Sequence, residues 1–308
     1  MADLFQQSKY IPKNPSILRL IHEYQNQYHP VFLKVKSEWN QVIREFLRDA
    51  TGLKLHSRKT NKGSLRDSGV DVIIKPDFND EFIKLVDKHY PDLDFQEFMA
   101  LRELKKAADY SIRYFNSDSH PSEELSKVIA YCESYFEKYN LEDIVQKLFA
   151  HTGKSKDIWG CYPHSGRCVE IYFLPLIIFS NLKGLQIEFA LVKVLVHELA
   201  HAYHHLGKDK DERVWDAFGE ADLNIVEGLA QYYTERFVDE FGSTYPKLID
   251  AYKAMVSCQS GPYRVHEEWS KKYTQEHVKH SLIQTRRNSI SQYDGFLYLL
   301  DEIRKNLN

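Results

Sequence analysis

The chain has 308 residues, of which 43% are hydrophobic and 28% charged, and its formal net charge is −3. These values are ordinary for a globular protein and allow one large domain or two small ones. The small net charge argues against binding of nucleic acid or an anionic membrane through a global field. Charged residues and proline interrupt the longest apolar runs, and the first residues contain no apolar signal core. We therefore expect a cytoplasmic protein with no membrane span.

The first half of the sequence carries a mainly helical pattern. Apolar residues recur at spacings of three and four in residues 16–50, in 80–115 with a break near position 90, after 122 and in 141–151. Residues 70–75 (VDVIIK) lie in a polar, glycine-containing stretch and predict one short strand. We therefore expect a mainly helical N-terminal region over residues 1–150.

A β-hairpin is predicted over residues 156–173. Two strand-like runs flank the turn-rich residues 163–166, and the second run, 168–173 (CVEIYF), is rich in strand formers. Cys161 and Cys168 would face each other across this hairpin. No secretory signal supports an oxidising compartment, so a disulfide there is only an open alternative.

The next element, residues 187–206, predicts a long apolar helix that contains His197-Glu198-Leu199-Ala200-His201, an HExxH motif. Residues four apart on a helix are offset by about 40° around its axis. The two imidazoles therefore project side by side and can share one metal ion, with Glu198 next to them. The strongly apolar run before the motif predicts burial, where ionisable groups are costly unless they are paired or bound to metal. This combination predicts a zinc hydrolase site, on a helix that ends at Gly207.

Zinc held for catalysis usually has three protein ligands and a water, so a third ligand is required. The metzincin spacing needs glycine at position 204 and histidine at 207, whereas this chain has His204 and Gly207. Glu227 is the strongest candidate for the third ligand, and Glu220 is the competing one. His204 is interpreted as a structural histidine, with a place in the cleft as the alternative.

Glu227 belongs to an expected helix over about residues 219–241. Its neighbours Ile225, Val226 and Leu229 argue against a solvated glutamate. The small Gly228 would let this helix approach the motif helix closely. The remaining C-terminal part is also predicted to be helical.

HELAH at 197–201 followed by EGLAQYY at 227–233 resembles the gluzincin group, the thermolysin-like zinc metallopeptidases. The resemblance covers roughly residues 158–241. It implies that His197, His201 and Glu227 bind one Zn²⁺ per chain and that Glu198 is the general base. Members of the group often carry an aspartate four residues after the glutamate ligand. Here that position is Gln231, whose side chain can still accept a hydrogen bond from a histidine ligand.

The resemblance also implies a fold class, which is α+β and predominantly helical. A zincin-like core over residues 151–308 would combine a small sheet or hairpin with the active-site helix and a helical C-terminal part. In zincins an edge strand before this helix binds the substrate backbone, and residues 168–173 are the candidate for that strand. Tyr263 and His266 follow a Gly-Pro turn and are the candidate donors to the oxyanion.

The sequence thus predicts a zinc-dependent metallopeptidase that acts on a peptide or protein substrate through an activated water. A zinc hydrolase of a non-peptide amide or ester is one alternative. A non-catalytic interaction protein stabilised by zinc is the other, and it would need a fourth ligand, such as His204, to close the site. We expect no nucleic acid or membrane partner, and the sequence leaves the oligomeric state and the cleavage specificity open.

Overall fold

The computed structural model describes residues 11–55, 57–59, 65–67, 69–75, 80–115, 123–140, 159–164 and 168–307. The helix predicted over 141–151 and the second half of the turn predicted over 163–166 lie outside these residues. The described chain is predominantly helical with little strand, in agreement with the predicted α+β class.

The N-terminal half follows the predicted pattern closely. Its helices are α2 (Pro15–Glu23), the π-helix η1 (Tyr24–Tyr28), α3 (His29–Thr51), α4 (Asp80–His89), α5 (Phe95–Phe115) and α6 (Glu123–Lys138). The predicted break near position 90 separates α4 from α5. The long first segment is continuous except for the π-turn, and α3 ends at Gly52 in the left-handed conformation (φ 71°), which glycine adopts without strain.

The C-terminal half contains the motif helix and the helices around it. They are α8 (Phe173–Lys183), α9 (Ile187–Leu206), η2 (Phe218–Glu220), α10 (Leu223–Phe241), α11 (Pro246–Ser257), η3 (Gly261–Arg264), α12 (His266–Lys272), α13 (Gln275–Arg287) and α14 (Tyr293–Leu307). The bounds of α9 confirm the prediction. Helix α8 was not predicted, because its sequence FLPLIIFSNLK is apolar on all sides and shows no helical period.

Two small sheets are described. The strands β1 (Ser57–Lys59) and β2 (Leu65–Asp67) form an antiparallel pair. The other sheet has the order β3-β5-β4, formed by β3 (Asp71–Lys75), β5 (Cys168–Tyr172) and β4 (Gly160–Cys161). Strand β3 runs parallel to β5 along its whole length, and β4 pairs antiparallel with it at Glu170 and Ile171.

This sheet corrects the prediction that residues 168–173 form an edge strand. Strand β5 is the middle strand of the three, so β3 and β4 already use its backbone hydrogen-bonding groups. The pairing with β3 joins segments nearly one hundred residues apart, and no local pattern reveals it. Cys161 pairs in register with Glu170 and Cys168 with Asp71, and both cysteines are free thiols.

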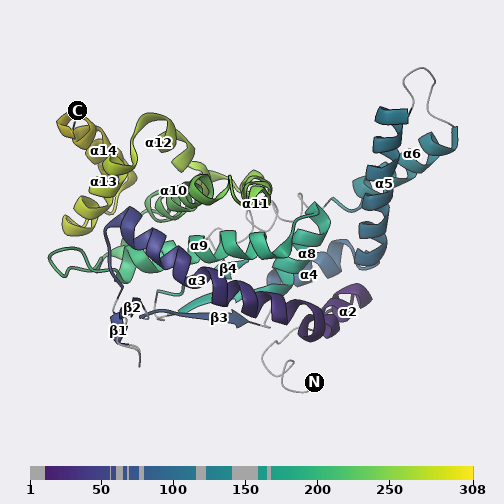
Figure 1. The fold of residues 1–308 in the computed structure, drawn as a ribbon, viewed down its shortest axis with the longest axis horizontal. Coiled ribbons are helices and arrows are strands. Elements are labelled where there is room, and N and C mark those ends of the chain that lie inside the picture. Colours follow the sequence, from purple (N-terminus) through teal and green to yellow (C-terminus); the bar gives the residue numbers. More distant parts are fainter. Residues whose placement is uncertain are drawn as a thin grey trace.

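Helix α9 lies in the middle of the fold (Figure 1). Helix α3 and the β3-β5-β4 sheet lie on one side of it, and α10 and the C-terminal helices lie on the other, while α5 and α6 project from the body. Every residue of α9 from Ala190 to His204 is buried. Because β3 and α3 pack with elements from beyond position 150, the core combines both halves of the sequence. Among the described residues, none of the helices has the length and apolarity needed to cross a membrane.

Candidate metal centre

Two neighbouring helices hold the three predicted ligands. His197 and His201 lie one turn apart on α9, and Glu227 lies on the first turns of α10, which packs along α9. Asp222 caps the start of α10, because its side chain accepts a hydrogen bond from the Asn224 amide at 2.8 Å. This cap fixes the beginning of α10 at Leu223, four residues before Glu227.

The three donor atoms form a nearly equilateral triangle. The Nε2 atoms of His197 and His201 are 3.2 Å apart. The Oε2 atom of Glu227 lies 3.2 Å from the first and 3.3 Å from the second. All three residues are buried, and among the described residues they form the group of side chains that could hold a metal ion. Glu220 is exposed and lies outside this group, so the structure favours Glu227 over it.

The size of this triangle fits a zinc ion. Ligands about 2.0 Å from zinc in tetrahedral geometry lie roughly 3.3 Å from each other. The observed edges of 3.2–3.3 Å agree with that value without any movement of the side chains. Two imidazoles and one carboxylate are also a common donor set for catalytic zinc. The residues present therefore fit the ion that the sequence predicts.

The ionisation of the group suits metal binding, which needs neutral imidazoles and an ionised carboxylate. Burial lowers the pKa of His197 to about 4, and the nearby charge of Lys193 acts in the same direction. Burial alone would raise the pKa of Glu227, but the charge of His201 and hydrogen bonds from both histidines hold it below its ordinary value. Lys193 is itself buried one turn before His197 and lies 5.9 Å from the centre of the Trp159 ring.

Glu198 is buried beside the triad, and a close contact with the sheet fixes its surroundings. A Cβ atom at Gly160 would lie 2.9 Å from Val194 Cγ1, 3.0 Å from the Glu170 carbonyl oxygen and 3.1 Å from Glu198 Cγ. Only glycine fits at this point of β4 without a shift of its neighbours. Strand β4 can therefore lie directly against the HExxH turn of α9.

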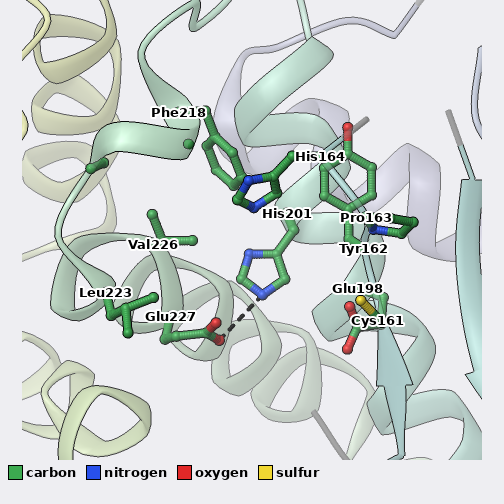
Figure 2. A pocket seen from close by; sticks show the side chains of 12 residues that line it. Cys161, Tyr162, Pro163, His164, Glu198, His201, Phe218, Leu223, Val226 and Glu227 are labelled. Atoms are coloured by element: carbon green, nitrogen blue, oxygen red, sulfur yellow. Dashed lines mark ion pairs between the residues drawn. The ribbon is translucent and has the colours of Figure 1, made fainter. Parts of the chain in front are cut away.

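A cavity of about 270 Å³ opens at this site (Figure 2). Glu198, His201 and Glu227 line it from the two helices. Its other walls are apolar or aromatic and come from β4 and from the η2–α10 segment: Cys161, Tyr162, Pro163, His164, Phe218, Gly219, Ala221, Leu223 and Val226. Among the described strands β4 is an outer strand of its sheet, so an outer strand and the candidate ligands border the same cavity.

His164 lines the cavity, although sequence reasoning placed it only in a turn. Its ring is exposed and packs on Phe218, with ring centroids 5.0 Å apart. His205 stacks on the same phenylalanine at 4.9 Å and 9°, and its Nδ1 lies 3.0 Å from the Tyr162 hydroxyl. Burial and the charge of His201 lower the pKa of His164. Its imidazole borders the cavity, where a ring N–H group could donate a hydrogen bond.

The two candidate oxyanion donors are placed differently. Tyr263 is buried in η3, and its ring lies nearly parallel to that of His197, with centroids 6.1 Å apart and an angle of 29°. His266 is fully buried, and its Nε2 lies 2.9 Å from the Tyr252 hydroxyl. Neither residue is among those that line the cavity. Tyr263 is thus adjacent to a candidate ligand, whereas His266 contacts α11.

His204 and Gln231 are both buried near the candidate ligands. His204 is fully buried against the ring of Tyr233, at 5.4 Å, which agrees with its interpretation as a structural histidine. Gln231 is buried and donates to Gln259 Oε1 at 2.6 Å, while its carbonyl oxygen has no hydrogen-bond partner among the described residues.

The small size of Gly228 serves a different contact from the predicted one. A Cβ atom there would lie 2.4 Å from Trp269 Cη2, so the missing side chain makes room for α12 rather than for α9. Gly207 ends α9 as predicted, but in an extended conformation with φ −63° and ψ 135°.

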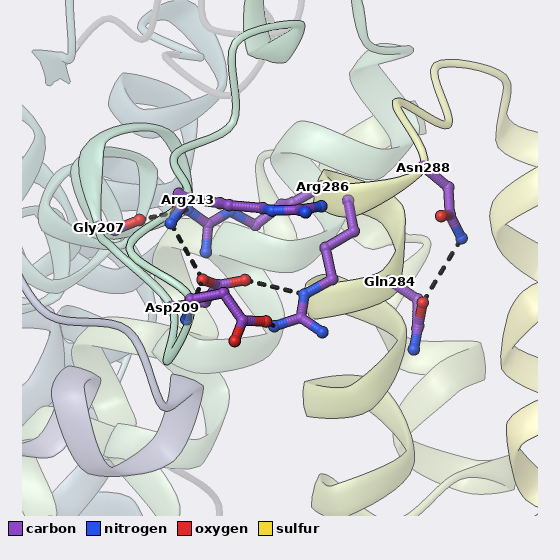
Figure 3. Close-up of polar contacts among 8 residues, drawn as sticks. Gly207, Asp209, Arg213, Gln284, Arg286 and Asn288 are labelled. Carbon is purple, nitrogen blue, oxygen red and sulfur yellow. Dashed lines mark hydrogen bonds and ion pairs between the residues drawn. The ribbon is translucent and has the colours of Figure 1, made fainter.

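The loop that leads from α9 to the cavity wall is tied to α13 (Figure 3). Arg287 Nε donates to Asp209 Oδ2 at 2.9 Å, and Arg286 Nη2 donates to the carbonyl oxygens of Gly207 and, at 3.1 Å, Arg213. The other carboxylate oxygen of Asp209 accepts the amides of Asp211 and Arg213. Since this loop continues into Phe218, α13 helps to fix one wall of the cavity.

Comparison of the chain with protein-family models, with curated proteins and with solved structures finds no match in any of the three. The fold and the geometry of the site therefore provide the basis for a functional assignment.

Proposed function

We propose that this protein is a zinc-dependent metallopeptidase of gluzincin type. The observation that carries the proposal is the triangle formed by His197, His201 and Glu227, with Glu198 beside it at the wall of a cavity. A structural zinc site is closed by four protein ligands, whereas a catalytic site keeps one position open. His204, the residue that would have closed the site, lies outside the donor group.

The chemistry follows from the residues of the chain. When bound, a zinc ion supplies Lewis-acid polarisation of a carbonyl and lowers the pKa of a water toward neutrality. Glu198 then accepts a proton from the attacking water and passes it to the leaving amine. The buried surroundings favour both proton transfers, because electrostatic interactions are stronger in a cavity of low dielectric constant.

The substrate backbone is proposed to add to the outer edge of β4. In the original candidate, residues 168–173, Glu170 and Ile171 are already paired on both sides, whereas Cys161 of β4 and the residues after it line the cavity. An extended peptide there would pass in front of Glu198 and between the aromatic walls. His164, together with Tyr263 from the His197 side, is a candidate donor to the negative oxygen that forms during attack.

Substitution of Glu198 by glutamine tests this proposal. Glu198→Gln keeps the shape of the side chain but cannot accept the proton, so hydrolysis of a peptide library should fall by roughly 10²- to 10⁴-fold. Zinc content should remain that of the wild type. The matched control is Glu220→Gln, an exposed glutamate near the cavity, which should leave both quantities unchanged.

Three results of this experiment have separate meanings. If the wild type binds zinc and hydrolyses simple amides or esters but no peptide, the non-peptide alternative is favoured. Zinc binding with no hydrolysis at all would favour the interaction protein. Full activity in Glu198→Gln would contradict the role given to this carboxylate.

A further inference from the structure

A second cavity, of about 490 Å³, lies between three helices and shares no residue with the first. Its walls come from α3, from the first turn of α9 and from the end of α10 with the residues that follow. The lining residues are Lys34, Val35, Glu38, Trp39, Val42, Gln186, Glu188, Phe189, Phe241 and Tyr245. Nothing in the proposed peptidase reaction uses these side chains.

Four aromatic rings form a continuous wall of this cavity. Tyr245 contacts Trp39 with centroids 4.9 Å apart at 69°, and contacts Phe189 at 5.9 Å and 44°. Trp39 contacts Phe241 at 6.1 Å and 76°. The Tyr245–Trp39 and Trp39–Phe241 contacts are edge-to-face, and the Tyr245–Phe189 contact is tilted. The faces of such rings carry negative partial charge.

These rings remain accessible despite their size. Trp39, Phe189 and Phe241 are half-buried, and Tyr245 is 38% exposed. The other three tryptophans, Trp159, Trp215 and Trp269, are at most 1% exposed. The sequence contains four tryptophans, so Trp39 is the one that a molecule in solution can reach.

The charges around the cavity favour a cation. Two carboxylates, Glu38 and Glu188, line it against the single ammonium of Lys34. The Lys34–Glu38 pair is 4.0 Å apart and exposed, so it neutralises Glu38 only weakly.

We propose that this cavity binds a small organic cation that carries an alkylated ammonium group. Such a group is weakly hydrated and is attracted to the faces of aromatic rings, most strongly to tryptophan. The volume lies within the range of small-molecule sites. The proposal is independent of the metal centre, because it uses none of the residues of that centre.

Trp39 provides the test. The full-length protein, with EDTA present to exclude any metal effect, is titrated with choline and with its neutral carbon isostere 3,3-dimethylbutan-1-ol. Tryptophan fluorescence reports binding, with Trp39→Phe as the background that isolates the signal of Trp39. Saturation-transfer NMR on the methyl protons of both probes is the second measurement. We expect saturable binding of choline, at least about fivefold tighter than that of the isostere.

Two variants locate the site and one controls for general effects. Tyr245→Ala and Glu188→Gln should each weaken choline binding by about two- to fivefold. Tyr298→Ala removes a tyrosine that is 69% exposed on α14 and should change nothing. Equal affinity for the two probes would show an apolar pocket and overturn the proposal. So would the absence of saturable binding in both measurements, or site variants that behave like Tyr298→Ala.

Discussion

The role of Glu227 as third ligand leads to a quantitative prediction for Glu227→Gln. Structural zinc sites with four ligands bind with about 10–16 kcal/mol, so one ligand accounts for roughly 3–4 kcal/mol. Loss of the anionic ligand should therefore raise the Kd for zinc by about 10²- to 10³-fold. Glutamine has nearly the same shape, and its amide oxygen can still accept a hydrogen bond from His197 or His201, so the fold should persist.

The thermal stability of the protein as a function of zinc concentration measures this change. At a free zinc concentration 100 times the wild-type Kd, binding should stabilise the wild type by about 2.7 kcal/mol. A variant with a 100-fold higher Kd should gain only about 0.4 kcal/mol under the same conditions. Competition with a chromophoric chelator gives the two Kd values directly, and mass spectrometry of the dialysed protein gives the zinc content.

Glu220→Gln is the matched control, because Glu220 is the exposed glutamate that competed for the role of ligand in the sequence. It should bind zinc as the wild type does. Wild-type zinc affinity in Glu227→Gln, or a loss of affinity in Glu220→Gln instead, would refute the three-ligand assignment.

The remaining predictions concern the surroundings of the site. Gly160→Ala places a methyl group against α9 and should cost about 1–3 kcal/mol in urea unfolding, with peptidase activity reduced and zinc retained. The metal-free protein should lose stability as the pH falls from about 6.5 to 4, because burial lowers the pKa of His197 to about 4 and the unfolded chain takes up the proton first. Arg287→Ala leaves the carboxylate of Asp209 without its guanidinium partner and should lower the midpoint of urea unfolding.

Each of these predictions has a matched comparison. Gly295→Ala, on a helix far from the sheet, is the control for Gly160→Ala. Equal losses of stability in the two variants would show that the β4–α9 contact has no special role. Arg304→Ala removes an exposed ion pair and is the control for Arg287→Ala, which should lower the stability clearly more. For the pH prediction, unfolding is followed with and without zinc. Stability of the metal-free protein that is constant between pH 6.5 and 4 would contradict the buried neutral state of His197.

The sequence predicted much of the local structure. The period of three and four placed α3 and α5 near their observed bounds, because amphipathic helices carry their signal within one segment. The long apolar run that contains the HExxH motif placed α9. The period failed for α8, whose residues are apolar on every side. The sequence also did not reveal that β5 is the middle strand of its sheet, because pairing with a parallel strand distant in the sequence leaves no local pattern.

The spacing of His197 and His201 determined by itself that two imidazoles project from one helix face, since the pitch of the α-helix fixes that relation. It also placed Glu198 beside them. Only the tertiary structure decided between Glu227 and Glu220, because the distance between α9 and α10 depends on their packing. Only the tertiary structure decided that His164 lies at the cavity, next to the sheet, and that His266 lies away from it, in contact with α11. Chemistry within one helix can be predicted from the sequence, whereas contacts between elements depend on how all of the surfaces are buried together.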